Sequence, residues 1–309
     1  MSKSFTFDLF RLNIEDTSNL FLDEKSLRIR NDEQITNILK ESCEAAHDQV
    51  QKTKSAVFKW SHRTYLNLAN IHEYRNLHYL ILARSVLEKD GFVVTDSGLS
   101  STTSISFPPL ASAVVCIFDL SRHLIAIEHS GQLSQTAWRD FLQKILAHTA
   151  IKLGFNSTIE IEPVPEHNNI VGLFLSFQRI TRMKLTLRIP NPELTRYTRE
   201  IYNDLKNSDI REITQDMKNP NGLSKSKEAR PFGCAVLAEQ GYKKGTITIE
   251  GLRNEKYEAA QLGADAARGA VKGLHDFIRG INSTIKTKEA QTALNAICAE
   301  IDRISPQIE

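Results

Sequence analysis

The sequence lacks most of the patterns by which a protein's chemistry is usually recognised. No apolar run approaches the ~20 residues that a membrane-spanning helix requires. The first residues, MSKSFTFDLFRLNIED, have neither the apolar core nor the small-residue cleavage site of a signal peptide. GxGxxG, P-loop, GxSxG and HExxH motifs are all absent. These absences exclude the commonest nucleotide-binding and hydrolase signatures, and they predict a soluble, cytoplasmic protein with no cofactor and no membrane partner.

The sequence also lacks a large net charge of either sign and closely spaced cysteines. Across 309 residues, 39 Lys and Arg against 37 Asp and Glu leave a net charge of +2. Any binding of anions must therefore come from local clustering of cations. The four cysteines, Cys43, Cys116, Cys234 and Cys298, are far apart and show no zinc-ligand spacing. We expect reduced, buried thiols in a reducing compartment.

Short apolar runs joined by turn signals predict an antiparallel sheet with packed helices in the first half of the chain. LHYLILARSVL and FVVTD flank Asp90-Gly91, a strong hairpin signal, and 97–109 then has the composition of a polar loop. ASAVVCIF and HLIAIEH flank a second tight turn, and such short connections allow only antiparallel pairing. A helix with regular apolar spacing is expected from Ser134 to Gly154.

The second half mixes strands and helices without a regular alternation, so the predicted class is α+β. Two prolines in the polar stretch EPVPEHNN favour a domain boundary there. We expect an antiparallel β-rich domain over 1–165 and an α+β domain, with a basic strand and loop, over 166–309.

Helix signals continue in this second domain. Asn191 and Pro192 have the character of an N-cap and a first helical residue. Two long helices are expected to end the chain, the first with apolar residues from Leu262 to Ile281 and the second with Leu294, Ile297 and Ile301 at helical spacing.

Cations concentrate between Arg179 and Arg230, where twelve Lys and Arg stand against seven Asp and Glu. In QRITRMKLTLRIPNPE the apolar residues alternate with cations, so a strand would bury one face and present a row of cations on the other. Downstream, NPNG and SKSK place small polar residues beside lysine. Backbone N–H groups can then approach a phosphate while lysine neutralises it.

This cluster has two interpretations, an ordinary solvated strand face and an anion-binding surface. We adopt the second as a hypothesis, with nucleic acid as the anion because no small-ligand motif accompanies the cations. Neighbouring aromatic residues suited to stacking on an unpaired base are Tyr197, Tyr202, Phe232 and Tyr242. The candidate nucleic-acid-binding residues are Arg179, Arg182, Lys184, Arg188, Arg196, Lys218, Asn221, Lys225, Lys227, Arg230, Lys243 and Lys244.

Two alternatives stay open, and neither has a firm motif. Asp119, Glu128 and His129 lie where a hairpin would bring carboxylates together, as a metal-dependent nuclease requires, but no lysine follows at the needed spacing. We therefore expect no metal site. The stretch GADAARGAVKG, 263–273, is rich in small residues that allow close helix packing, which suits a scaffold protein that forms a homodimer.

Several phrases carry a resemblance to a known family. They include FTFDLFRLNI, LARSVLEKDGFVVTD, PPLASAVVCIFDL, RHLIAIEHSGQLSQTAWRDFL, TRMKLTLRIPNPELTRYT and TQDMKNPNGLSKSKEARPF. They resemble a bacterial family known only as a domain of unknown function, nearly from end to end. The resemblance implies a stand-alone bacterial cytosolic protein and no particular activity. The layout is also similar to that of phage-defence and phage-exclusion proteins that bind DNA as dimers. This likeness implies a sensor or effector with a partner in such a system.

Overall fold

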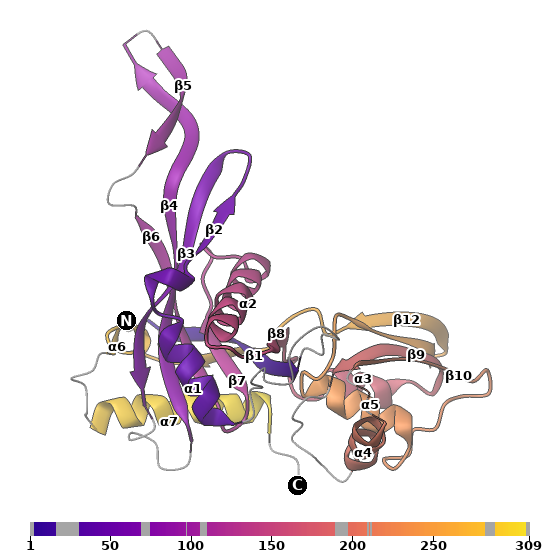
Figure 1. Cartoon of the computed structure of the whole chain (residues 1–309). Helices are drawn as coiled ribbons and strands as arrows, with labels where there is room; N and C mark the ends of the chain where they lie inside the picture. Colours follow the sequence, from indigo (N-terminus) through magenta and orange to yellow (C-terminus); the bar gives the residue numbers. More distant parts are fainter. Residues whose placement is uncertain are drawn as a thin grey trace.

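The chain folds around two antiparallel sheets of different size (Figure 1). The computed structural model describes residues 3–16, 31–68, 75–96, 98–105, 110–188, 197–208, 210, 212–281 and 288–306. In the first sheet the strand order is β13-β1-β7-β6-β4-β3-β2, with β5 also paired to β4 and β8 also paired to β1. In the second sheet the order is β10-β9-β11-β12. The α+β class predicted from the sequence is confirmed.

The first sheet and its helices draw on both ends of the described chain. Its strands are β1 (Phe5–Asp16), β2 (Gln49–Lys52), β3 (Ala56–Asn67), β4 (Leu77–Thr95), β5 (Gly98–Ile105), β6 (Ala111–Asp119), β7 (Leu124–Glu128), β8 (Ser157–Pro163) and β13 (Arg268–Val271). The helices packed with it are α1 (Asp32–Glu41), the short 3-10 helix η1 (Ala45–His47), α2 (Gln135–Lys152), α6 (His275–Arg279) and α7 (Lys288–Ile304).

The second sheet is built from a continuous middle segment of the chain. Its strands are β9 (Arg179–Arg188), β10 (Glu212–Lys218), β11 (Ile247–Arg253) and β12 (Lys256–Leu262). Its helices are α3 (Ile170–Ser176), α4 (Arg199–Asn207) and α5 (Arg230–Glu239). The helix start predicted at Asn191 and Pro192 lies outside the described residues.

The first sheet is buried on both faces, which explains why β7 is apolar at successive positions rather than alternating. α1 and α2 cover one face, where Trp138 packs edge-on against Phe10 and Phe141 stacks on Trp60. α6 and α7 cover the other face over a separate apolar cluster that includes Phe5 and Phe7. The predicted hairpin β6–β7 and the predicted helix α2 are both confirmed.

The hairpin predicted at Asp90-Gly91 is wrong, because β4 runs straight through both residues for 19 residues. Gly91 does not have a positive φ, so the backbone there is extended and does not turn. The chain reverses instead between Thr95 and Gly98, which face each other across the β4–β5 pair. Much of the polar loop predicted over 97–109 is therefore strand β5, and the two strands extend well beyond the body of the first sheet (Figure 1).

The first of the two predicted C-terminal helices is also wrong, whereas the second is present as α7. The region from Leu262 to Ile281 holds the end of β12, the strand β13 and the short helix α6. Gly269 shows the reason, since a Cβ there would lie 2.4 Å from Cζ of Phe7. A glycine is needed where β13 passes over this ring, and the small residues of 263–273 therefore serve packing within the chain.

Residues 166–267 thus leave the first sheet after β8, form the second sheet and return to pair β13 with β1. The boundary placed between 165 and 166 stays a prediction. Among the described residues, no helix combines the length and apolar character needed to cross a bilayer. All four cysteines are free thiols, with Cys43 partly buried and the other three buried.

Candidate nucleic-acid interface

The second sheet has one face covered by helices and one face open. Side chains from α3, α4 and α5 pack on the inner face against Met183, Leu185, Leu187, Ile247 and Ile249. The intervening residues of β9 point the other way because side chains alternate along a strand. No helix covers that side in the described part of the chain. The row of cations predicted from QRITRMKLTLRIPNPE lies there.

Strand register sets which side chains are neighbours on this open side. Arg182 stands opposite Lys218 of β10 and Glu250 of β11, and Lys184 stands opposite Asp216 and Thr248. Charged residues of both signs therefore meet across the strands. We define the outer face by its charged residues and one exposed aromatic residue: Arg179, Arg182, Lys184, Arg188, Glu212, Asp216, Lys218, Lys244, Glu250 and Tyr257.

Carboxylates hold most of these cations in place. The guanidinium of Arg182 donates from Nε to Oδ1 of Asp216 at 2.8 Å and from Nη1 to Oε1 of Glu250 at 3.0 Å. The hydrogen bond from Arg182 holds the pKa of Asp216 well below its ordinary value. Lys218 adds a second ion pair to Asp216 at 3.2 Å.

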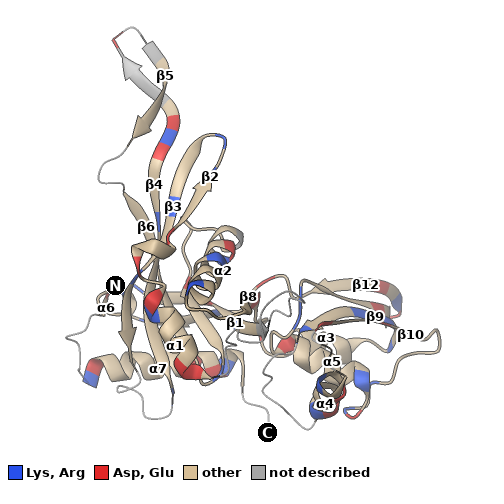
Figure 2. Cartoon of the chain, in the orientation of Figure 1, with Lys and Arg blue, Asp and Glu red and all other residues tan. Residues whose placement is uncertain are grey.

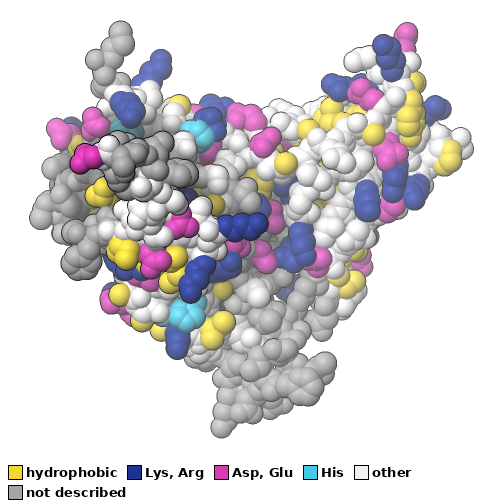
Figure 3. Space-filling model, turned by 90° about the horizontal axis from the view of Figure 1, so that it is seen from above, with side chains coloured by type: hydrophobic (Ala, Val, Ile, Leu, Met, Phe, Trp, Pro, Cys, Tyr) yellow, Lys and Arg dark blue, Asp and Glu magenta, His cyan; other side chains and the backbone are white. Residues whose placement is uncertain are grey.

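A second group of ion pairs lies at the other end of β9. Arg188 pairs with Glu212 at 2.5 Å and, from Nη1, with Glu160 of β8 at 3.2 Å. Lys244 also pairs with Glu212 at 3.2 Å, and hydrogen bonds from both cations lower the pKa of that carboxyl group. Figures 2 and 3 show the result, since residues of opposite charge interleave over the second sheet instead of forming one continuous basic patch.

Two cations of the outer face are exposed and form no ion pair with a described residue. Lys184 lies in the middle of β9, and Arg179 lies at its start, where its aliphatic carbons approach Gly222. Counting Glu160, the outer face brings six cations next to four carboxylates. The local excess of positive charge is therefore smaller than the sequence predicts, and Lys184 and Arg179 are its unneutralised part.

The other candidate residues do not share this face. Lys225 donates from Nζ to the carbonyl oxygens of Leu175 and Phe177, at the C-terminal end of α3. Arg230 pairs with Asp204 of α4 at 3.2 Å. Lys227 is exposed in the loop before α5. The backbone N–H of Asn221 closes a turn on the side chain of Asn219, and Arg196 lies outside the described residues.

Lys243 is buried rather than exposed, with 1% of its surface accessible. Its Nζ donates to the carbonyl oxygens of Gly263 and, at 3.3 Å, Gly245. Burial lowers the pKa of this ammonium group to about 8, while the nearby Glu162 opposes the shift. A positive φ of 85° at Gly263, and the contact of that residue with the lysine, leave no room for a side chain there. Lys243 is therefore a structural residue.

Removal of this lysine gives a testable dependence of stability on pH. The folded pKa of about 8 lies below the ordinary 10.5, so the unfolded chain binds more protons between these values and stability rises with pH in that window. Against a Lys243→Met variant, the free energy of unfolding of the unmodified chain should rise by on the order of 2 kcal/mol from pH 8 to pH 10.5. Urea denaturation at the two pH values measures this.

Burial raises the pKa values of all four thiols, the partly buried Cys43 included, and they act in the opposite sense above pH 9, but they do so equally in both proteins. The difference between the proteins therefore isolates Lys243. Lys244→Met, on the exposed neighbour, is the matched control and should follow the unmodified chain. Equal pH profiles for Lys243→Met and Lys244→Met would contradict the assignment.

The aromatic residues predicted to stack on bases point into the protein. Phe232 is 5% exposed and packs against Phe174 and Tyr197, and Tyr242 is 1% exposed beneath the guanidinium of Arg11. Tyr202 is partly buried on α4. None of these rings lies on the outer face.

Tyr257 of β12 is the aromatic residue that the sequence interpretation missed. It is 63% exposed, and its hydroxyl lies 2.8 Å from Oγ1 of Thr181 on β9. A signal for it does exist in the sequence. Asn254 and Glu255 separate the alternating runs ITIEGLR and KYEAAQL, and asparagine favours the positive φ that a two-residue hairpin turn requires. Both residues do have positive φ in the structure.

The carboxylates considered for a nuclease do not form a metal site. Asp119 is fully buried and pairs with Arg75 at 2.8 Å. Glu128 pairs with Arg279 at 3.2 Å and with His275 at 3.4 Å, while His129 pairs with Asp8 at 2.9 Å. Each of these carboxylates is therefore paired with an arginine or a histidine of the protein itself. Within the described ranges no three side chains of the metal-binding types gather as an ion would require.

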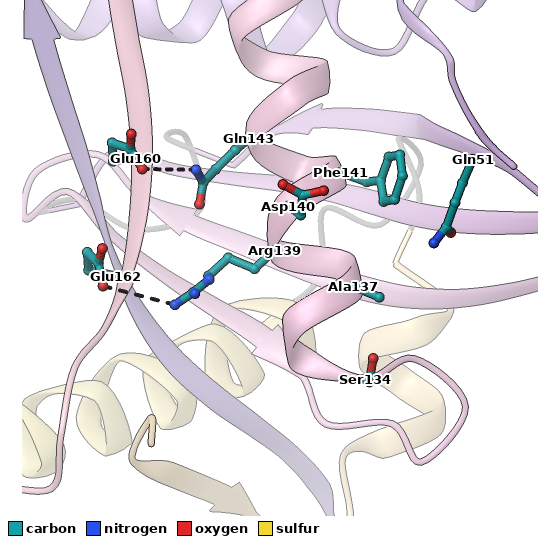
Figure 4. A pocket seen from close by; sticks show the side chains of 9 residues that line it. All are labelled: Gln51, Ser134, Ala137, Arg139, Asp140, Phe141, Gln143, Glu160 and Glu162. Atoms are coloured by element: carbon teal, nitrogen blue, oxygen red, sulfur yellow. Dashed lines mark hydrogen bonds and ion pairs between the residues drawn. The ribbon is translucent and has the colours of Figure 1, made fainter. Parts of the chain in front are cut away.

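A pocket of about 460 Å³ opens between α2 and β8 (Figure 4). Glu160 accepts a hydrogen bond from Gln143 at 3.0 Å, and Glu162 lies 4.0 Å from Arg139. Burial raises the pKa of Glu162. With Asp140 the lining has three carboxylates and one arginine, so it repels phosphate and is not a nucleic-acid site.

Comparison with known proteins shows a similarity to one family over part of the chain. Residues 107–260 match the family described as "Domain of unknown function (DUF4747)". The match begins just before β6 and ends in β12, so it includes strands of both sheets and the outer face. It supports the resemblance found in the sequence over this part of the chain. No curated protein matches the chain.

Proposed function

We propose that this protein binds nucleic acid through the outer face of the second sheet and catalyses no reaction on it. The observation that carries the proposal is the meeting of six cations on the one sheet face that no described helix covers. Phosphate oxygens accept hydrogen bonds from Arg and Lys without regard to base sequence. The face therefore suits binding to the backbone of a nucleic acid, with little or no sequence preference.

The ion pairs of the outer face determine how strongly we expect it to bind nucleic acid. Four carboxylates neutralise part of the six cations, which leaves an excess of about two positive charges. Each phosphate contact contributes roughly 0.9 to the slope of log K against log salt concentration for duplex DNA. We therefore expect a shallow slope of about −2 and moderate affinity at low salt. A strongly basic protein would give a much steeper slope.

Charge reversal at Lys184 tests the proposal. Because Lys184 is exposed and unpaired, Lys184→Glu removes a phosphate contact and adds a repulsive charge without breaking any described ion pair. Affinity for a labelled duplex at 50 mM salt should fall about tenfold, as measured by fluorescence polarisation. Lys206→Glu, on the helix-covered side in α4, carries the same charge change and should have little effect.

No binding by the unmodified chain at low salt would refute the proposed function. Equal losses for Lys184→Glu and Lys206→Glu would show instead that net charge, and not the outer face, determines binding. Incubation with Mg²⁺ or Mn²⁺ and gel analysis of the nucleic acid tests for the nuclease alternative.

A bacterial origin, a role as sensor or effector in antiphage defence and assembly as a homodimer belong to this proposal through the resemblance alone. The helix-packing argument for a homodimer does not survive, because 263–273 forms no helix. Light scattering at high protein concentration tests for the dimer.

A further inference from the structure

The strongest unexplained feature of the outer face is its exposed aromatic ring. Tyr257 lies on β12, and β11 separates that strand from β9, where Thr181 accepts or donates the hydrogen bond of the phenol. Neighbouring strands are about 4.8 Å apart, so the hydrogen-bonded pair Tyr257–Thr181 spans roughly 10 Å of sheet. A side chain standing upright from β12 could not do this. The phenol therefore leans across β11 towards β9, and because Tyr257 is still 63% exposed, part of the ring is open to solvent.

The hydrogen bond to Thr181, which we call the tether, also holds the ring in place before any ligand binds. Oγ1 of Thr181 bonds the phenol at 2.8 Å and the carbonyl oxygen of Glu250 at 3.2 Å, which joins β9, β11 and β12 through one hydroxyl. A 63% exposed side chain would otherwise sample several rotamers. Less conformational entropy is therefore lost when a flat ligand stacks on the ring.

Two arginines of β9 lie at the same end of the sheet as this ring. Leu252 pairs with both Tyr257 and Arg179, which places Arg179, whose guanidinium pairs with no described acid, two strands from Tyr257 on the same side of the sheet. Arg182 follows on β9, with Lys218 opposite it on β10. A fixed aromatic surface beside a short track of cations is the arrangement that binds single strands, in which the base stacks and the phosphates contact the cations.

We propose that the outer face takes single-stranded nucleic acid, with one base stacked on Tyr257 and the adjoining phosphates on Arg179, Arg182 and Lys184. This inference rests on the proposed function and specifies its ligand. In a duplex the bases already stack on each other and their faces are not available to a protein ring. The preference arises from stacking, so it tolerates any base and adds to the electrostatic attraction.

The experiment compares two labelled probes, a 12-nucleotide single strand of mixed sequence and the duplex of the same sequence, in DNA and in RNA. The unmodified chain should bind the single strand about tenfold or more tightly. Tyr257→Ala should remove most of that preference and leave duplex affinity within about twofold. Tyr257→Phe keeps the ring and loses only the tether, so it should retain most of the affinity for the single strand.

The outcomes separate this inference from the proposed function. Binding that responds to Lys184→Glu but not to Tyr257→Ala, or equal affinity for duplex and single strand, would overturn the inference and leave the proposed function standing. No binding to either probe would remove both. Circular dichroism and thermal unfolding of Tyr257→Ala should match those of the unmodified chain, because the side chain is exposed, and this match would show that a loss of affinity is not a loss of structure.

Discussion

A chain carrying both Asp216→Asn and Glu212→Gln is expected to bind nucleic acid about tenfold more tightly than the unmodified chain at 50 mM salt. The two carboxylates neutralise Arg182, Lys218, Arg188 and Lys244, and the amides that replace them can still accept hydrogen bonds from these side chains. The net charge of the outer face would become more positive by two, while its side chains would keep the same size and shape. The slope of log K against log salt should steepen by about 2.

The matched control adds the same charge away from the outer face. Asp204→Asn and Glu300→Gln together remove acid partners of Arg230 and Arg303; Asp204 lies in the helix layer of the second sheet and Glu300 in α7, which packs on the first sheet. This control should change affinity by less than about threefold, since charges beyond a Debye length of about 10 Å are largely screened. A gain in affinity for the control and none for the outer-face variant would place the binding surface elsewhere.

Asp119→Ala is expected to lower the free energy of unfolding by about 3 to 5 kcal/mol. Asp119 is fully buried at the end of β6 and pairs with Arg75, which also bonds Asp302 of α7. Arg122, 3% exposed, bonds Asp302 as well and donates at 2.7 Å to the carbonyl oxygen of Ser305 at the end of α7. Loss of the carboxylate would leave Arg75 without its buried partner.

Urea denaturation measures the change, with Asp140→Ala as control. Asp140 pairs with Lys144 one turn along α2, and both side chains are more than half exposed. Surface pairs of this kind contribute less than about 0.5 kcal/mol. Similar losses for the two variants would show that the network around Asp119 does not hold α7 to the first sheet.

Elements with a single dominant pattern could be predicted from the sequence. The helical spacing of Trp138, Phe141, Leu142 and Ile145 predicts α2, and the alternation around Met183 predicts β9. In these segments one buried face decides the structure, and the residues of that face are close together in the chain.

Elements that depend on distant contacts could not be predicted. Asp90-Gly91 has turn chemistry, but pairing with β5 keeps β4 extended through it. Gly263 to Gly273 has the small residues of a close-packed helix, but Phe7, more than 250 positions earlier, makes 268–271 a strand. Local propensity is a weak guide wherever tertiary pairing competes with it.

The candidate site divides in the same way. The sequence places Arg182, Lys184 and Arg188 on one side of a strand, and they do lie on one face. The acid partners of Arg182 and Arg188 come from β8, β10 and β11, whose register is set by turns and bulges that the sequence does not show. The burial of Lys243 could not be predicted either, because its partner Gly263 is twenty residues away and nothing near Lys243 in the chain indicates this contact.

The strands that pair with β1 are synthesised long after β1 itself. This strand pairs with β7, β8 and β13, and the last of these begins at Arg268. During synthesis the first part of one edge of β1, Phe5 to Asp8, stays uncovered until some 250 further residues have emerged. The strands of the second sheet all lie between Arg179 and Leu262, so they can pair with one another before β13 has been synthesised. A nascent chain would thus hold a finished outer face before its first sheet is closed.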